Sequence, residues 1–280
     1  MRNLNFIKSN PAIVFLVFMI IWSWSSWSII FSIFPMDMEN NMPSPIAVIL
    51  VGLGASPSLI GIIFTRIYDG KGSIRSFLSR LLQWKVNFKF YLLALFMVPI
   101  ISAIAIAFQL FLRGSTLESN IIGRIGVAIG AGIFAGLIEE FGWRGFALNK
   151  LLIKYNLLKS AIITGLFWGL WHTAINYLGL RQYGLLVIPI LVLVGPIQLT
   201  AFTVLMAFIY KRTKGSILLM VLSHTSISGS AIIFTLSNST AINYLRYQFI
   251  YTALVCIIAT IVVLLHKKLF KEQPSVVASE

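Results

Sequence analysis

The stretch EEFGWRG at residues 139–145 puts two carboxylates side by side near the end of a long apolar run. Glu140 and Arg144 are one helical turn apart, so a structural ion pair would account for both of them. That explanation leaves Glu139 without a local partner. A carboxylate beside another one, in poorly solvated surroundings, is suited to taking a proton from water, so Glu139 is a candidate general base.

Two of the three histidines also lie inside apolar runs. His172 stands four residues after Trp168 and four before Asn176, so these three side chains share one face of a helix. His224 and Ser228 share a helix face in the same way. Either histidine alone could simply hydrogen-bond to a neighbouring helix. Together with the acid pair, they predict a water-accessible site built from three separate segments.

The composition decides which elements can hold these side chains. Hydrophobic residues make up 58% of the 280 residues and charged residues only 11%, whereas an ordinary soluble domain carries about a quarter charged residues. The chain is therefore an integral membrane protein, and a soluble enzyme is excluded. Its net charge of +14 is spread over the ends of apolar runs, so no nucleic-acid partner is expected. The single cysteine, Cys256, permits no intramolecular disulfide.

A membrane-spanning helix needs about 20 apolar residues. We predict an all-α, polytopic membrane helix bundle of about eight transmembrane helices. The predicted spans are 12–34, 45–65, 90–112, 121–138, 160–179, 184–210, 216–236 and 247–266. The span 184–210 is long and contains Gly195 and Pro196, so it is either one kinked helix or two shorter pieces.

The basic residues predict the orientation of the bundle. Of the 22 Lys and Arg residues, 17 fall on the side of the two termini and four on the other side, which predicts that both termini are cytoplasmic. An amphipathic stretch near 72–84 is predicted to lie in the cytoplasmic interface, with a solvated linker as the alternative. We expect a single integral membrane domain over 1–270, a flexible tail over 271–280, and a prokaryotic plasma membrane as the location.

Depth along the spans is compatible with one shared site. At 1.5 Å per residue, His172 and His224 lie about 18 Å and about 12 Å from the cytoplasmic starts of their predicted spans. Glu139 lies near the cytoplasmic end of its own span. All three side chains are therefore predicted in the cytoplasmic half of the membrane.

Three motifs on three helices carry a family resemblance. They are Glu-Glu-x-x-x-Arg ending at Arg144, aromatic-x-x-x-His ending at His172, and His-x-x-x-polar running from His224 to Ser228. This set resembles the CAAX protease and bacteriocin-processing (CPBP) family of intramembrane proteases, which includes Rce1-type prenyl endopeptidases and Abi proteins. The resemblance covers about 124–230 and implies a catalytic core over about 121–236.

The resemblance implies a role for each site residue. Glu139 and His172 would activate a water for attack on a peptide carbonyl, and Glu140 would pair with Arg144 to organise the site. His224 would stabilise the oxyanion, an effect typically worth several kcal/mol of barrier. The implied activity is that of a glutamate-dependent endopeptidase that cuts a membrane-associated or lipidated peptide near the cytoplasmic face.

One position departs from the family pattern. The third motif usually ends in asparagine, where this sequence has Ser228, whose hydroxyl is shorter than an amide. This departure motivates an alternative, a non-catalytic family member that acts as a membrane scaffold or as a bacteriocin-immunity or regulatory protein. A small transporter is a weaker alternative, because the two halves of the sequence have no repeat symmetry.

Cofactors and partners follow from the same residues. Two histidines and a glutamate could also ligate zinc, but the chain has no His-Glu-x-x-His pattern, so we predict no cofactor and no tightly bound metal. The expected partners are a membrane-embedded or lipidated peptide or protein substrate and the lipid bilayer.

Overall fold

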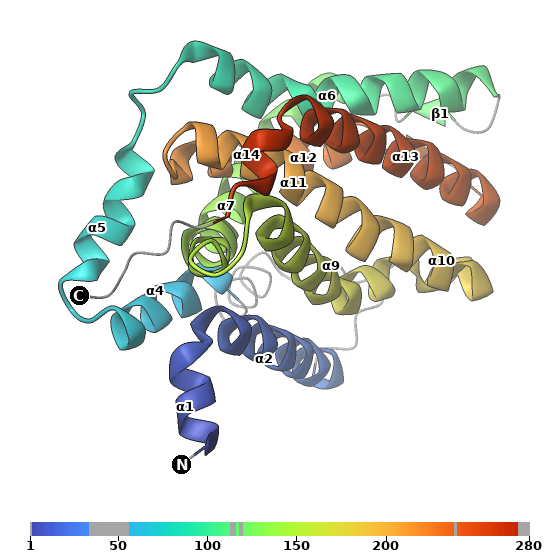
Figure 1. Ribbon diagram of the computed structural model, residues 1–280. Helices are drawn as coiled ribbons and strands as arrows, with labels where there is room; N and C mark the ends of the chain where they lie inside the picture. Colours follow the sequence, from blue (N-terminus) through green and yellow to red (C-terminus); the bar gives the residue numbers. More distant parts are fainter. Residues whose placement is uncertain (1, 34–55, 113–115, 118–119, 238–239, 274–280) are drawn as a thin grey trace.

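The computed structural model describes residues 2–33, 56–112, 116–117, 120–237 and 240–273, and this part of the chain is almost entirely helical (Figure 1). Polar side chains cap the helix starts, as Asn156 does by accepting a hydrogen bond from the Lys159 amide. The elements in chain order are α1 (Arg2–Ser9), α2 (Pro11–Ile33), α4 (Pro57–Tyr68), α5 (Ser73–Ser79), η1 (Arg80–Leu82), α6 (Phe88–Phe111), β1 (Thr116–Leu117), α7 (Ile121–Glu140), η2 (Phe141–Leu148), α8 (Asn149–Leu151), α9 (Leu157–Leu180), η3 (Arg181–Leu186), α10 (Val187–Val192), η4 (Leu193–Ile197), α11 (Gln198–Arg212), α12 (Ile217–Ile233), β2 (Leu236–Ser237), α13 (Ala241–Leu265) and α14 (Lys267–Lys271).

The described part of each predicted span coincides largely with helix, and residue 34 of the first span and residues 45–55 of the second lie outside the described residues. Five helical stretches of the described chain are long and apolar enough to cross a membrane, and α4 and α12 are shorter apolar helices. The five stretches are Pro11–Ile29, Phe88–Phe111, Ile121–Leu151, Arg181–Arg212 and Ala241–Leu265. At 24 residues α9 is also long enough, and its polar residues make it less apolar. The all-α, multi-pass membrane architecture is thus confirmed.

The fourth span is longer than its sequence suggests. The predicted end at residue 138 is wrong, because the helix continues from α7 through the π-helical turns of η2 and through α8 to Leu151. The whole of η2 is buried, including the fully enclosed Arg144. The acid pair therefore lies inside a helix of 31 residues rather than at its edge.

The predicted span 184–210 is a kinked helical run. Gly184 has a positive φ of 57° that breaks the helical geometry within η3, and Pro196 lies in the π turn η4 between α10 and α11. Proline removes one backbone donor, and a π turn accommodates that loss while the helix continues.

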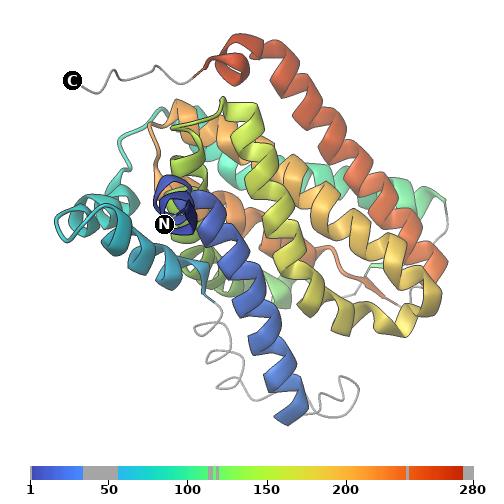
Figure 2. The ribbon, with the colours of Figure 1, turned by 60° about the horizontal axis from the view of Figure 1, so that its bottom comes forward.

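Close packing of α7 against α12 brings two of the three motifs together. Gly132 and Gly136 have the small-xxx-small spacing that lets helix backbones approach in a membrane. A Cβ on Gly132 would lie 2.8 Å from the Thr225 carbonyl oxygen, and one on Gly136 would lie 3.0 Å from the Val221 carbonyl oxygen. The third motif helix, α9, packs between α2 and α11 (Figure 2).

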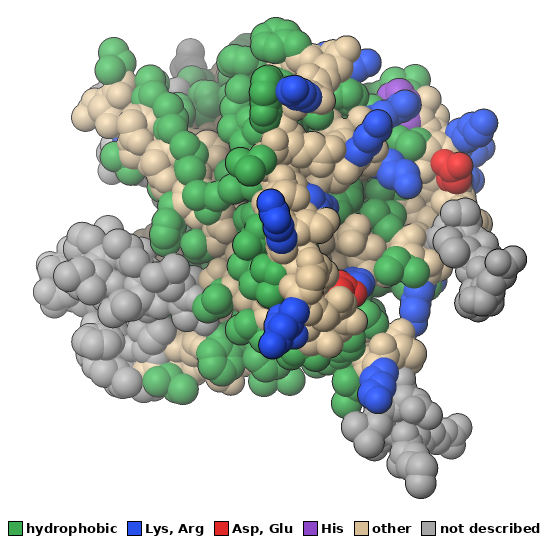
Figure 3. Space-filling view, turned by 90° about the vertical axis from the view of Figure 1, so that its left-hand side faces the viewer, with side chains coloured by type: hydrophobic (Ala, Val, Ile, Leu, Met, Phe, Trp, Pro, Cys, Tyr) green, Lys and Arg blue, Asp and Glu red, His purple; other side chains and the backbone are tan. Residues whose placement is uncertain are grey.

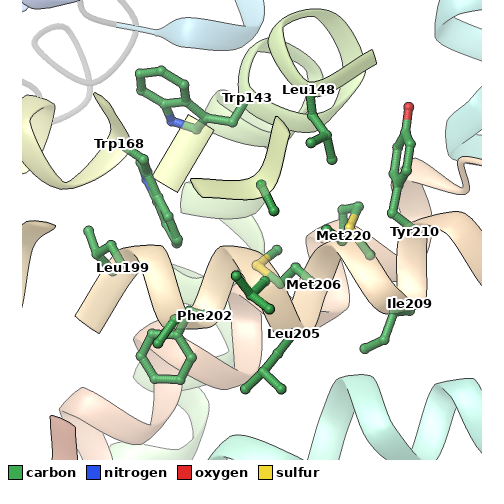
Figure 4. Close-up of a cluster of buried hydrophobic side chains, with 14 of the residues drawn as sticks. Trp143, Leu148, Trp168, Leu199, Phe202, Leu205, Met206, Ile209, Tyr210 and Met220 are labelled. Atoms are coloured by element: carbon green, nitrogen blue, oxygen red, sulfur yellow. The ribbon is translucent and has the colours of Figure 1, made fainter. Parts of the chain in front are cut away.

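The buried core surrounds the motif helices. Trp168 from α9 reaches toward Leu199 and Phe202 of α11, and Trp143 from η2 lies on the far side of Trp168 from α11 (Figure 4). Figure 4 also shows Tyr210 and Met220 closing the other end of this cluster.

Two short features lie at opposite ends of the bundle. β1 and β2 pair antiparallel through Thr116 and Ser237 and join the α6–α7 and α12–α13 connections. At the other end, α5 and η1 form the predicted amphipathic helix near 72–84, with Phe77 buried and Arg75 exposed. Figure 3 looks onto this second end, where Lys and Arg side chains gather. Residues 274–280 of the predicted tail lie outside the described residues, and α14 is helical to Lys271.

Candidate active site

Glu139 is held by two tryptophans. The indole Nε1 of Trp168 on α9 donates to Glu139 Oε2 at 2.8 Å, and Nε1 of Trp143 on η2 donates to the same oxygen at 3.2 Å. The glutamate is only 4% exposed. Both donors are neutral, so the carboxylate is oriented without a cationic partner on that oxygen. Its other oxygen, Oε1, lies 3.8 Å from Nε2 of His224.

Glu140 has a different set of partners. Arg144 donates from Nη1 to Glu140 Oε1 at 2.8 Å, which is the ion pair predicted from the sequence. Nδ1 of His224 lies 2.7 Å from the same oxygen. Because an ionised carboxylate only accepts, Nδ1 of His224 carries the hydrogen. The second arm of Arg144, Nη2, donates to Thr203 Oγ1 on α11 at 2.9 Å, which ties a fourth segment to the site.

Trp168 is the centre of this arrangement. The Arg144 guanidinium carbon lies 4.1 Å from the centroid of its ring, within the range of a cation–π contact. The rings of His172 and His224 lie 5.6 Å and 5.4 Å from it. Trp168 therefore contacts Glu139, Arg144 and both histidines.

His172 is half-buried and differs from His224 in its partners. Its Nδ1 lies 3.1 Å from the carbonyl oxygen of Trp168, so this nitrogen carries a hydrogen and the neutral ring has its lone pair on Nε2. Its ring packs edge-on against Trp171, with centroids 4.7 Å apart. The charge of Glu139 also interacts electrostatically with the His172 ring. A neutral imidazole with a free Nε2 beside a carboxylate can accept a proton from water.

A cavity of about 630 Å³ reaches His172, and we call it the tyrosine cavity. Four tyrosines with several amide and hydroxyl side chains line it. Tyr183 stacks on Tyr244 with centroids 5.0 Å apart, and Tyr247 stacks on Tyr251 at 5.9 Å. The polar members of the lining are Ser102, His172, Asn176, Gln182, Tyr183, Gln198, Thr235, Tyr244, Tyr247, Gln248 and Tyr251.

The tyrosine cavity lies toward the helix ends that carry few basic residues. Most of its lining comes from the end of α9, η3, the start of α11, the end of α12 and the start of α13. Lys159 near the start of α9, Lys211 near the end of α11 and Lys267 just beyond the end of α13 lie at the opposite side. The sequence had favoured a site in the cytoplasmic half. The continuation of α7 into η2 moves the acids deeper, and the cavity beside His172 extends away from the basic end.

Ser228 is the predicted site residue that these contacts do not include. It is half-buried on α12, one turn beyond His224, and it is not part of the lining of the tyrosine cavity. Asn176, one turn beyond His172, does line that cavity. The structure thus gathers Glu139, Glu140, Arg144, His172 and His224 in one place and leaves Ser228 beside it.

Sequence reasoning missed two site residues. Trp143 lay between the residues of the acid motif and was not considered as a donor, although it is four residues after Glu139. Thr203 lies on a segment with no charged neighbour, and no spacing connects it with Arg144. Thr203 is one of several polar residues within apolar runs, and nothing in the sequence distinguishes it from the others.

The residues present fit a metal ion poorly. Among the described residues, no group of three or more His, Cys, Asp or Glu side chains could hold one. Glu140 Oε1 is already shared by Arg144 and His224, and Glu139 Oε2 by two indoles. Independence from metal stays a prediction.

Comparison with known proteins matches part of the chain to a family. Residues 121–230 match the family model described as type II CAAX prenyl endopeptidase Rce1-like. The chain contains an Rce1-like domain. A relative is the CAAX prenyl protease 2 of Methanococcus maripaludis, which is 23% identical over 236 residues, covering 81% of this chain and 84% of that protein. The CPBP resemblance of the three motifs is confirmed.

The Rce1-like domain begins with α7 and ends within α12. All six predicted site residues, from Glu139 to Ser228, lie within it. The tyrosine cavity is built partly from outside the Rce1-like domain, because Ser102 on α6 and the four residues of α13 line it as well. The Rce1-like match supports an intramembrane endopeptidase and a multi-pass membrane location.

Proposed function

We propose that the protein is an intramembrane endopeptidase in which Glu139 and His172 activate the attacking water. The observation that carries this proposal is the Glu139 carboxylate, which two indoles hold by hydrogen bonds and which lies 3.8 Å from Nε2 of His224. Neither histidine uses its Nε2 in a hydrogen bond described above, and His172 borders a cavity large enough for a peptide segment. These features supply a base, a second imidazole and a place for the substrate.

The proposed reaction is a hydrolysis. The water oxygen bonds to the carbonyl carbon while its proton passes to Glu139 or to Nε2 of His172. His224 keeps its Nδ1–H on Glu140 and, in its doubly protonated form, donates Nε2–H to the oxyanion, an effect typically worth several kcal/mol. The carbon–nitrogen bond then breaks, the held proton passes to the leaving amine, and the carboxylic acid formed gives up its own proton, so that a carboxylate and an ammonium group remain.

We propose a membrane-associated peptide or lipidated protein as the substrate, in a cell membrane. The name of the Methanococcus relative suggests a prenylated tail. The lining of the tyrosine cavity, with its amides and hydroxyls, is suited to hydrogen-bond a peptide chain. The peptide segment itself is therefore proposed to enter by this cavity, and any lipid chain to stay in the bilayer.

The test compares membrane peptides from cells with and without the protein, then follows cleavage of the substrate found by wild type and Glu139→Gln. Glutamine keeps an oxygen for both indole donors, so the fold should persist while the rate falls by about 10²–10⁴-fold. Glu272→Gln is the matched control, because Glu272 is exposed at the end of α14. Equal cleavage by wild type and Glu139→Gln would refute the proposed mechanism.

A second candidate is a non-catalytic scaffold or immunity protein, favoured by Ser228 where the family usually has asparagine. A cellular phenotype that survives both Glu139→Gln and His172→Ala would support it. Loss of the phenotype in both variants, with normal protein levels, would exclude it.

A further inference from the structure

A second large cavity lies at the basic end of the bundle. Its volume is about 710 Å³, and the α4–α5 connection, η1, α8 and the α11–α12 turn enclose it. We call it the basic cavity. Nothing in the proposed hydrolysis uses it.

The charge of this lining is strongly unbalanced. Arg80, Lys211 and Lys214 are its cationic members, and Asp69 is its acidic one. The Asp69 carboxylate is already engaged by Lys150 in an ion pair. The three cations of the lining therefore face the cavity with no acid left to balance them among the residues that line it.

Arg80 is fixed in place by neutral acceptors. Its Nε donates to the Gly215 carbonyl oxygen at 3.1 Å and its Nη1 to the Gly145 carbonyl oxygen at 3.1 Å. Its Nη2 donates to the Tyr210 hydroxyl, and its guanidinium lies over the Tyr210 ring, 5.3 Å from the centroid. Because these partners are uncharged, the positive charge is held rigidly at the cavity wall without being cancelled.

Lys214 occupies a backbone conformation that lysine rarely adopts. Its φ is +55°, and Gly215 follows with a φ of +87°. Glycine takes a positive φ at no steric cost, whereas a residue with a Cβ does not. Backbone strain of this kind is found at functional sites more often than elsewhere. A lysine at this position lowers the stability of the fold and adds positive charge to the cavity. We therefore infer that the charge of Lys214 has a function.

The remaining lining combines polar side chains, among them Thr65, Ser73 and Ser76, with an apolar wall. Ser76 offers a neutral hydrogen-bond donor, and Phe77, Leu152 and Ile153 form the wall. Ile153 is 64% exposed. Positive charge next to an exposed apolar wall, at the cytoplasmic end of a membrane bundle, suits an anionic group attached to a hydrocarbon chain.

We propose that the basic cavity binds a phosphate group, as the headgroup of an anionic phospholipid of the cytoplasmic leaflet or as free phosphate. Arg80 forms the fixed wall of this site, and Lys211 and Lys214 contact the phosphate oxygens. Binding does not depend on catalysis, so it stands or falls separately from the proposed hydrolysis.

The experiment uses the full-length protein in neutral detergent micelles with phosphatidylcholine. Phosphatidylglycerol is titrated in one arm and inorganic phosphate in the other, and the thermal midpoint is followed. We expect a saturable rise with phosphatidylglycerol. A lysine near a membrane surface typically changes lipid affinity about fivefold, so Lys211→Ala with Lys214→Gly should weaken binding roughly 25-fold. Lys214→Gly alone should leave the turn intact, because glycine fits its φ.

The control is Lys267→Ala with Lys268→Ala, which removes the same charge from exposed positions of α14 at the same end. A rise with phosphatidylglycerol alone identifies a lipid headgroup, and an equal rise with inorganic phosphate identifies a free anion; both support the site. Equal weakening by the α14 pair and the cavity pair would show a diffuse charge effect and overturn the proposal. No saturable response in either arm would overturn it as well.

Discussion

The adjacent carboxylates of Glu139 and Glu140 have different hydrogen-bond partners. Glu140 is paired with a cation and a histidine, whereas Glu139 receives hydrogen bonds from two neutral indoles. A carboxylate neutralised by an arginine is a poor base, while one oriented by neutral donors keeps its charge for chemistry. We therefore propose a structural role for Glu140 and proton transfer for Glu139.

The structural role of the ion pair predicts a stability effect. Arg144→Met leaves the fully buried Glu140 without its cation, which should lower the free energy of unfolding by about 3–5 kcal/mol. The measurement is denaturant unfolding in mixed micelles, with Arg75→Met as the matched control, because Arg75 is exposed on α5. An equal, small effect of the two substitutions would contradict this role.

Trp168 predicts a milder effect on catalysis. Trp168→Phe keeps a ring for Arg144 and the two histidines but removes the N–H that donates to Glu139. Loss of one hydrogen bond to a charged group, worth about 1.5–3 kcal/mol, should lower kcat/KM by roughly 10- to 100-fold. Trp84→Phe, at a 60% exposed position, is the control. An unchanged kcat/KM would remove Trp168 from the site.

At this scale the sequence was informative where charge is scarce. Glu139, His172 and His224 stand out because ionisable side chains are rare in apolar runs. The pairing of Glu140 with Arg144 followed from helical spacing. Thr203 could not be found in this way, because its contact with Arg144 depends on how α11 packs against η2, and spacing along one helix carries no information about that.

The helix pair α7 and α12 sets the distance between the acids and His224. Gly132 and Gly136 face α12 directly, and both of the acids follow within two turns on the same helix. Buried glycines at this spacing act as the spacer of the site, because any side chain there must push the helices apart.

Substitution of this spacer should damage the site from a distance. Gly136→Val would bring a side chain into the backbone of Val221, so we expect a lower thermal midpoint and a loss of cleavage even though no catalytic group has changed. The control on the same helix is Gly130→Ala, since Gly130 is exposed and a Cβ there meets nothing within 4 Å. A stable, fully active Gly136→Val variant would show that the helices are not held by this contact.

The positions of the spans were predictable from apolar length, but their internal breaks were only partly so. Pro196 signalled the kink before α11. The π turns of η2 had no such signal, because the charged motif looked like the end of an apolar span. Tertiary packing keeps this segment helical, with hydrogen bonds between its charged side chains and side chains of α9, α11 and α12.

The whole molecule has two unlike ends. Lys and Arg side chains gather at the end seen in Figure 3, which also holds the basic cavity. The tyrosine cavity lies toward the other end. The positive-inside rule predicts that the first end faces the cytoplasm and that the tyrosine cavity faces away from it.

This orientation can be measured with single cysteines. In a Cys256→Ala background, a membrane-impermeant maleimide applied to intact cells should label Gln182→Cys, which borders the tyrosine cavity. Lys214→Cys, at the basic cavity, should be labelled only after permeabilisation. The parent without cysteine gives the background. The reverse labelling pattern would overturn the orientation and return substrate entry to the cytoplasmic side.

The orientation could be predicted from the sequence because charge counts need no knowledge of packing, and it stays a prediction. The cavities could not be predicted, since each is enclosed by four or more segments that are distant along the chain. Tyr183 and Tyr251, for example, border one cavity from η3 and α13, and no pattern within either segment relates them.

The two indoles on Glu139 also make the site optically observable without a label. Two of the seven tryptophans of the chain donate directly to this carboxylate. Their emission should therefore report its protonation and the arrival of a bound peptide, and the difference spectrum between wild type and Trp168→Phe isolates the contribution of one of them. The chain thus carries its own spectroscopic readout at Glu139, the carboxylate proposed as the general base.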